Sequence, residues 1–251
     1  MADLNCEVVE KKLVTWLRKK VDDAGASGGI VGLSGGLDSS VTAVLAQKAF
    51  GENVLGLILP CYSSKEDRKA AEKLAQKFSL EYRIKNLDPL LEEFMEIMEG
   101  DRERSTEDSL AVANVKPRLR MTVLYYYAAR KNYLVIGTDN WSELKVGYFT
   151  KHGDGGVDLA PLGRLVKTEV RQLAEYLDIP REIIEKPPSA GLWEGQTDEK
   201  EMGFSYQELD HYILEGEAEP EVKEKIEELA QKSSHKLAPI PVPERDYLRE
   251  K

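Results

Sequence analysis

Short apolar runs alternate with longer amphipathic stretches along much of the chain. The runs are too short for helices and are rich in β-branched residues, which predicts strands. They are GGIVGLS (28–34), NVLGLILP (53–60), EYRIKNL (81–87) and NYLVIGT (132–138). Strands that alternate with helices predict an α/β fold with a parallel, doubly wound sheet covered by helices on both faces. Such a sheet binds its ligands outside the carboxyl ends of its strands.

The stretches between and after these runs have the apolar spacing of amphipathic helices. In the opening helix, apolar residues recur every three to four positions from Val9 to Val21. The predicted helices span 7–23, 36–51, 63–80, 88–100, 116–131, 166–177, 205–216 and 219–233. Two segments, 102–113 and 186–203, lack clear periodicity and are predicted to be loops, either lids that close over a site or disordered connectors. Prolines after His235 predict an irregular end.

Composition narrows the class of protein. The 251 residues contain no repeat and no domain linker, so we expect one domain over 1–251. A net charge of −10 disfavours nucleic-acid partners, and no apolar run is long enough to span a membrane. The two cysteines, Cys6 and Cys61, match no metal-site spacing and are expected to be reduced thiols, which predicts a cytoplasmic protein.

The segment SGGLDSS (34–40) joins the first predicted strand to a helix. Gly35 and Gly36 let the backbone turn its N–H groups inward, and the helix start adds a partial positive charge, so the loop favours a phosphate. Asp38 would repel that phosphate unless a cation stood between them, and Mg²⁺ is bound by carboxylates together with phosphate oxygens. The alternative interpretation is that Asp38 only caps the helix.

The loop and the second half of the chain resemble a known family. S-G-G-x-D-S is the pyrophosphate loop (PP-loop) of the N-type ATP pyrophosphatases, in the adenine nucleotide alpha-hydrolase-like superfamily. Further blocks resemble the ammonia-dependent NAD synthetases: NVKPRLRM (114–121), IGTDNWSELKVGYFTKHGDGGVDLAPLGRLVKTEVRQLA (136–174), EKPPSAGL (185–192), GFSYQELDHYILEG (203–216) and HK (235–236). The resemblance implies a Rossmann-like fold and ATP-dependent amidation of deamido-NAD by ammonia. The products would be NAD, AMP and pyrophosphate, formed through an adenylated intermediate.

Site residues follow from the same resemblance. It assigns ATP binding to Gly32, Leu33, Ser34, Gly35, Gly36, Leu37, Asp38, Ser39, Thr138, Lys167 and Ser189. It assigns Mg²⁺ binding to Asp38 and Glu143. It assigns deamido-NAD to Arg118, Lys151, Asp158, His235 and Lys236. Asp38, Lys167 and Asp154 are the candidate catalytic residues. Asp154 would meet ammonia and accept a proton; alternatively, it is a turn aspartate before Gly155.

The family's pattern is not matched everywhere. GTDNWSE (137–143) replaces the frequent GTDHAAE, Pro117 stands where alanine is usual, and Ser189 replaces a threonine. The family is homodimeric, so a homodimer is implied. Without a glutaminase domain, the chain would take free ammonia or receive it from a separate donor protein.

Two other functions stay open from the sequence. One is a different adenylating PP-loop enzyme, such as a tRNA-modifying protein or a synthetase subunit, although this would favour a basic surface. The other is an ATP-binding module without turnover. Two metal-ready carboxylates and a lysine beside the loop favour catalysis instead.

Overall fold

A four-stranded parallel sheet forms the centre of the part of the chain that the structure describes. This computed structural model describes residues 4–100, 109–189, 197–245 and 248. The strands are β1 (Gly28–Gly32), β2 (Val54–Ile58), β3 (Tyr82–Ile84) and β4 (Tyr133–Ile136), in the order β3-β2-β1-β4. The chain moves outward from β1 to β3 and then returns to place β4 on the other side of β1. The order therefore reverses between β1 and β4, which is where a doubly wound sheet opens a ligand crevice.

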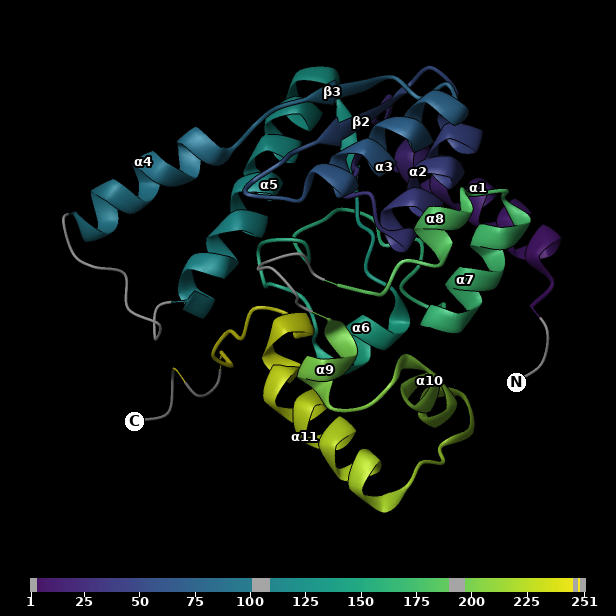
Figure 1. Cartoon of the computed structure of the whole chain (residues 1–251), viewed down its shortest axis with the longest axis vertical. Helices are drawn as coiled ribbons and strands as arrows, with labels where there is room; N and C mark the ends of the chain where they lie inside the picture. The colour runs from purple at the N-terminus through teal and green to yellow at the C-terminus, as the bar shows by residue number, and fades with distance from the viewer. Residues whose placement is uncertain (1–3, 101–108, 190–196, 246–247, 249–251) are drawn as a thin grey trace.

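Side chains alternate strictly between the two faces of the sheet. Ile30, Leu55 and Val135 lie in one apolar cluster, and their chain neighbours Val31, Val54 and Ile136 lie in the other. The second cluster is covered by α1 (Cys6–Asp23), α2 (Leu37–Phe50), α3 (Lys65–Lys77), α7 (Lys167–Tyr176) and α8 (Arg181–Ile184). The first is covered by α4 (Asp88–Glu99) and α5 (Ser109–Lys131) (Figure 1). The predicted α/β fold, with helices on both faces, is confirmed.

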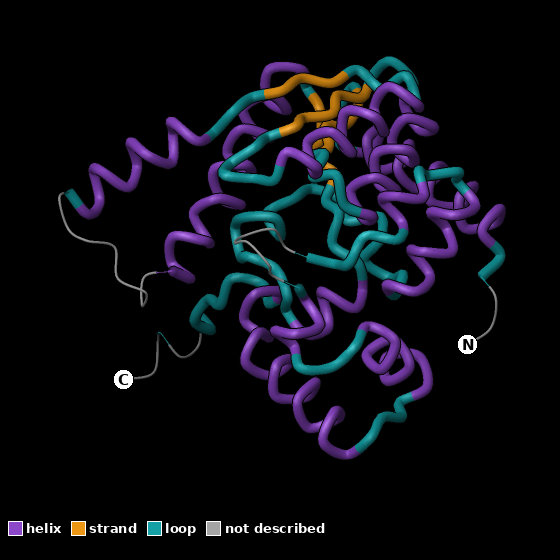
Figure 2. The backbone as a smooth tube through the Cα atoms, in the orientation of Figure 1, coloured by secondary structure: helices purple, strands orange, loops and turns teal. Residues whose placement is uncertain are grey.

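A smaller helical lobe lies beyond the carboxyl ends of the strands. It consists of α6 (Trp141–Val146), α9 (Asp198–Met202), α10 (Tyr206–Glu215) and α11 (Pro220–Leu237). Val146, Met202, Leu209 and Ile226 form its own buried cluster. Figure 2 shows that this lobe is entirely helix and loop, with all strands in the other part of the molecule. None of the described helices is long and apolar enough to cross a membrane.

Some predicted boundaries are wrong. The helix expected at 116–131 begins at Ser109, so 109–113 is helix rather than loop, and the helix continues through Pro117. The last helix continues to Leu237, which makes His235 and Lys236 helical. The short helices α6, α8 and α9 were not predicted, and α9 lies within the segment expected to be loop at 186–203. Of the two predicted loops, residues 102–108 and 190–196 lie outside the described residues.

Candidate active site

The loop between β1 and α2 is held in a tight turn by its own serines. Gly35 has a φ of +81°, a conformation that favours glycine, and a side chain there would place Cβ 2.2 Å from the Asp67 carbonyl oxygen. The hydroxyl oxygens of Ser34 and Ser39 lie 2.9 Å apart, and the Gly36 N–H donates to Ser34 Oγ at 3.2 Å. The start of α2 at Gly36 has no side-chain cap. The loop therefore presents the uncapped amino end of a helix, as phosphate binding requires.

Asp38 does not cap its helix. Its Oδ1 accepts a hydrogen bond of 2.9 Å from Asn140 Nδ2, and its Oδ2 accepts one of 2.6 Å from Lys167 Nζ. The interpretation of Asp38 as a helix cap is therefore wrong. Asn140 follows the end of β4 and Lys167 begins α7, so the aspartate joins three separate segments at the crevice between β1 and β4.

Lys167 lies between two carboxylates. Its Nζ is 2.6 Å from Asp38 Oδ2 and 3.0 Å from Glu143 Oε1, and the side chains of Lys167, Asp38 and Glu143 are 6%, 16% and 13% exposed. Burial acts to lower the pKa of Lys167, but the two carboxylates overcome it and raise that pKa. Burial raises the pKa of Glu143 to about 7, opposed by the lysine. A permanent cation thus faces two acids in a water-poor site.

The helical lobe fixes the position of Lys167. Asp210 on α10 is fully buried; it accepts hydrogen bonds from Ser142 Oγ and, at 2.7 Å, from the Thr168 N–H. Ser142 Oγ in turn accepts the Lys167 N–H at 3.0 Å. The ring of Tyr206 lies 4.8 Å below the lysine ammonium. These contacts anchor the first turn of α7 and leave the ammonium little freedom.

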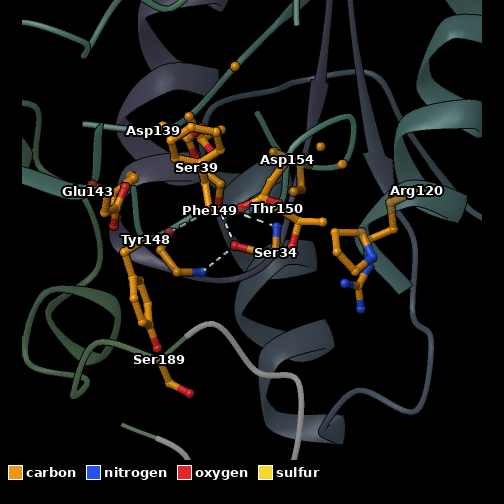
Figure 3. Close-up of a pocket in the computed structure, with 18 of the residues that line it drawn as sticks. Ser34, Ser39, Arg120, Asp139, Glu143, Tyr148, Phe149, Thr150, Asp154 and Ser189 are labelled. Carbon is orange, nitrogen blue, oxygen red and sulfur yellow. Dashed lines mark hydrogen bonds between the residues drawn. The ribbon is translucent and has the colours of Figure 1, made fainter. Parts of the chain in front are cut away.

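A cavity of about 480 Å³ lies over the loop and the ends of the strands. Its wall includes residues 32–34 and 36–39, with Thr138, Glu143, Asp154, Lys167 and Ser189 from later segments. Several of these side chains lie around the same pocket in Figure 3, including Ser34, Ser39, Glu143, Asp154 and Ser189. The structure therefore brings the residues predicted for ATP, metal and ammonia to one cavity; Gly35 lies in the same loop.

Asp154 has a structural contact as well as a place on the cavity wall. Its Oδ1 accepts the Thr150 N–H at 2.9 Å, which closes the turn at 150–155. Enclosure by protein raises the pKa of its carboxyl. The turn interpretation and the cavity interpretation are therefore compatible, because one carboxylate holds the turn while it borders the cavity.

The residues predicted for the dinucleotide divide into three sets. Arg118 Nε donates to the Lys151 carbonyl at 3.4 Å, and Lys151 Nζ donates to the His235 carbonyl at 2.8 Å, so these three are neighbours. Lys236 lines the cavity and donates to the carbonyls of Gly147 and Phe149. Asp158 lies apart from both. Its carboxylate accepts hydrogen bonds from Tyr125 and from the Val135 N–H, which braces β4.

Three residues of the site were not identified from the sequence, and two of them line the cavity. Arg120 lines the wall and donates hydrogen bonds to the Leu59 carbonyl and to Ser63 Oγ. Burial lowers the pKa of its guanidinium. Asp139 also lines the wall, and Asn140 holds Asp38. The position of Asp139 directly after Thr138 at the end of β4 is a signal that could have identified it, since the same rule pointed to Thr138.

The arrangement suits nucleotide chemistry that releases a phosphate group. A helix start and a fixed lysine face one cavity, where they can stabilise developing negative charge on a leaving group, and the two carboxylates beside them can hold a cation. Among the described residues, no group of three or more His, Cys, Asp or Glu side chains is placed to hold a metal ion by protein ligands alone.

Comparisons with known proteins agree with this geometry. A family model described as NAD synthase matches residues 9–240. The NH(3)-dependent NAD(+) synthetase of Carboxydothermus hydrogenoformans is 53% identical, over 93% of this chain and 96% of the relative. An NMN synthetase structure from Francisella tularensis has a TM-score of 0.90 at 39% identity, covering 96% of this chain and 99% of its own. An NH3-dependent NAD synthetase from Campylobacter jejuni, in complex with nitrate, has a TM-score of 0.79 at 31% identity, covering 96% and 100%.

Proposed function

The chain belongs to the NAD synthase family, and from this premise we propose that it catalyses the ATP-dependent amidation of deamido-NAD by ammonia. The products are NAD, AMP and pyrophosphate. The observation that carries the proposal is the convergence of Asp38, Lys167 and Glu143 against the glycine loop, within one cavity. A chain that only bound ATP would have little use for a buried lysine between two carboxylates at this position.

The reaction has two steps. The nicotinate carboxylate attacks the α-phosphorus of ATP, which forms a mixed anhydride with AMP as the bond to pyrophosphate breaks. The loop amides at 34–39 and Lys167 receive the pyrophosphate and stabilise the charge as it develops. Ammonia then attacks the activated carbonyl and AMP leaves. Thr138 and Ser189, on the same wall, are proposed to contact ATP.

The residues present fit a Mg²⁺ ion. Asp38 and Glu143 face a common cation, Lys167 Nζ, so two carboxylates already converge from different segments. Mg²⁺ is usually held by one or two carboxylates together with substrate phosphates, which agrees with the lack of a larger cluster in the described parts of the chain. When bound, it would neutralise charge on the phosphate oxygens.

We assign the remaining roles by position. Asp154, on the cavity wall, accepts a proton as ammonia becomes nucleophilic. Arg118, Lys151, His235 and Lys236 bind the far part of the dinucleotide, because they form a basic group that begins at the cavity with Lys236 and continues outward. Asp158 fits this role least well, since both of its oxygens already accept hydrogen bonds within the protein.

Product analysis by mass spectrometry tests the function. Purified protein is incubated with ATP, Mg²⁺, ammonium and deamido-NAD, and each component is omitted in turn. NAD, AMP and pyrophosphate should form together and disappear when ammonium is omitted. If ATP binds but no amide product forms, the assignment is wrong.

A second candidate substrate is nicotinate mononucleotide. The Francisella structure with a TM-score of 0.90 is named an NMN synthetase, which favours this shorter acceptor. The basic group of Arg118, Lys151 and His235 favours the dinucleotide instead, because these residues lie beyond the cavity wall. A comparison of kcat/KM for the two acceptors decides between them, and a larger value for the mononucleotide would replace deamido-NAD as the substrate.

We further propose a single-domain homodimer that uses free ammonia, or ammonia from a separate donor. Relatives whose names specify ammonia are matched over nearly their whole length. In Figure 1, α4 extends away from the rest of the molecule. Leu90, Ile97 and Met98 on this helix are 47%, 67% and 60% exposed, which supplies an apolar surface for a second copy. The cytoplasmic location stays a prediction.

A further inference from the structure

Asn140 is fully buried where the chain passes from β4 into α6. Its Nδ2 donates to Asp38 Oδ1 at 2.9 Å, and its backbone N–H donates to Glu143 Oε2 at 3.1 Å. Its own Oδ1 accepts the Glu143 N–H at 3.0 Å, which caps α6. A single asparagine therefore holds both of the carboxylates that are proposed to bind Mg²⁺.

Each of these carboxylates has one oxygen bonded to Asn140 and the other bonded to Lys167. In Asp38, Oδ1 contacts the asparagine amide, and Oδ2 accepts from the lysine ammonium at 2.6 Å. In Glu143, Oε2 contacts the asparagine backbone, and Oε1 accepts from the same ammonium at 3.0 Å. Because Asp38 Oδ2 and Glu143 Oε1 already face one cation, they are the oxygens that a metal ion would meet.

The amide side chain of Asn140 suits this position. A carboxylate oxygen accepts hydrogen bonds and a backbone N–H donates them, so the residue between them must offer one donor and one acceptor. Aspartate and serine are also favoured N-cap residues. However, ionised aspartate has no donor, and serine is too short to reach Asp38 while it caps the helix. The asparagine therefore does more than cap α6, because its Nδ2 fixes one oxygen of Asp38.

A carboxylate with one oxygen held in this way suits some metal ions better than others. We propose that Asn140 is a positioning residue that restricts Asp38 to one free oxygen and thereby favours Mg²⁺ over Ca²⁺. This inference rests on the proposed function and its metal site. Mg²⁺ requires a small octahedral shell, whereas Ca²⁺ takes roughly six to eight oxygens and often both oxygens of one carboxylate. Asp38 can offer its second oxygen to Ca²⁺ only if it loses the hydrogen bond from Asn140.

Binding of metal–nucleotide complexes tests this role without turnover. The probe is α,β-methylene-ATP, which cannot be split between its α- and β-phosphorus atoms. It is supplied with Mg²⁺ or with Ca²⁺, and its dissociation constant is measured by titration calorimetry. Wild type should bind the Mg²⁺ complex more tightly than the Ca²⁺ complex. In Asn140→Ser, the Mg²⁺ complex should bind about tenfold more weakly, whereas the affinity for the Ca²⁺ complex should change by less than about threefold.

A second variant and a matched control separate this role from helix capping. Asn140→Asp keeps the shape of the side chain and the cap oxygen, but it donates no hydrogen bond to Asp38, so the ratio of the two constants should shift in the same direction. Asn5→Ser makes the same substitution at the N-cap of α1, where Asn5 is exposed and accepts the Val8 N–H at 3.2 Å. The control should leave the ratio within about twofold of wild type.

The outcomes distinguish the metal preference from the reaction itself. An unchanged ratio in both Asn140 variants would show that the residue only caps α6, and a wild type without preference would equally overturn the inference. NAD formation is measured on the same wild-type sample. If that sample prefers the Mg²⁺ complex but forms no amide, the proposed function fails while the role of Asn140 in the metal site stands.

Discussion

At the scale of single residues, Lys167 supplies the counter-charge to both Asp38 and Glu143. Its ammonium is 2.6 Å from one carboxylate and 3.0 Å from another, and all three side chains are largely buried. Breaking a buried pair by removing one partner is strongly destabilising, because the remaining charge has neither water nor a counter-ion. The same lysine thus contributes to folding and, by our proposal, to the stabilisation of pyrophosphate.

Lys167→Ala should lower the free energy of unfolding by about 3 kcal/mol and kcat by on the order of 100-fold. The stability change is measured by urea unfolding of magnesium-free protein, and kcat by NAD formation. Lys73→Ala is the control, since Lys73 pairs with Glu182 at the surface, with 63% and 50% exposure. It should cost less than about 1 kcal/mol. Equal losses in the two variants would contradict a special role for the buried pair.

The titration of Glu143 predicts a dependence of stability on pH. Burial raises the pKa of Glu143 from 4.5 to about 7 in the folded protein. Between these values the folded protein holds a proton that the unfolded chain has lost, so stability falls as pH rises from about 4.5 to about 7 and then levels off.

Glu143→Gln should remove this part of the slope, about 2 kcal/mol between about pH 5 and about pH 7.5. Urea unfolding of magnesium-free wild type and variant at both pH values measures the difference. Asp139 and Asp154 also have raised pKa values and remain in both proteins, and because Glu143 itself raises the pKa of Asp139, the difference reports Glu143 together with its effect on Asp139. A slope identical in the two proteins would show that Glu143 is already ionised at low pH.

Residues with strong local signals could be predicted, whereas those defined by distant partners could not. The glycine loop, Asp38, Glu143 and Lys167 all have a place in a motif, and the structure brings them together. Asp210 has no such signal, because its importance comes from Ser142 and Thr168, which lie more than 40 residues earlier in the chain. Asp158 had a motif match, yet its oxygens are taken up by Tyr125 and Val135.

At the scale of elements, the turn into α2 depends on backbone conformation as much as on side chains. Gly35→Ala should cost about 2 to 4 kcal/mol, because φ is +81° and Cβ would meet the Asp67 carbonyl oxygen at 2.2 Å. Gly51→Ala is the control, with a φ of +59° and open space around its Cβ, and should cost about 1 to 2 kcal/mol. Thermal unfolding with and without ATP measures both. Equal costs, with ATP stabilisation retained in Gly35→Ala, would contradict the close approach.

The start of α5 shows why helix periodicity was missed. Leu110, Asn114, Pro117, Met121 and Leu124 recur every three to four residues and all line the cavity. Because this face of the helix borders a cavity rather than a packed core, it mixes apolar and polar residues, and the apolar pattern is interrupted. Pro117, which normally ends a helix, added to the error. Sequence periodicity therefore predicts packed helices better than helices that line a site.

At the scale of the whole molecule, a parallel sheet could be predicted from the sequence, but the order of its strands could not. Alternating strands and helices predict a parallel sheet, and the reversal between β1 and β4 then explains why the glycine loop and residues 138–143 meet. Of the helical lobe, only α10 and α11 were predicted, and only as separate helices. Its attachment depends on the buried contact of Asp210 with the start of α7, between segments distant in the chain.

The dimer prediction also belongs to this scale. Ile97→Glu combined with Met98→Glu should convert the homodimer to a monomer, because both side chains are among the most exposed apolar groups of α4. Light scattering after gel filtration measures the mass. Leu214→Glu, on the exposed side of α10 at 38%, is the control and should remain dimeric. A wild-type monomer, or a dimer in both variants, would show that α4 does not form the interface.

The contact of Asp210 with the start of α7 also bears on how the protein is made. The ribosome releases the loop at 34–39 early, and Lys167 follows well over one hundred residues later. Lys167 is not anchored until Asp210 has also left the exit tunnel, because only then can Ser142 and Thr168 find their buried partner. A nascent chain that stalls before this point carries Asp38 and Glu143 without a fixed counter-charge. The site for nucleotide chemistry is therefore completed late in translation, although the loop at 34–39 is among the first segments made.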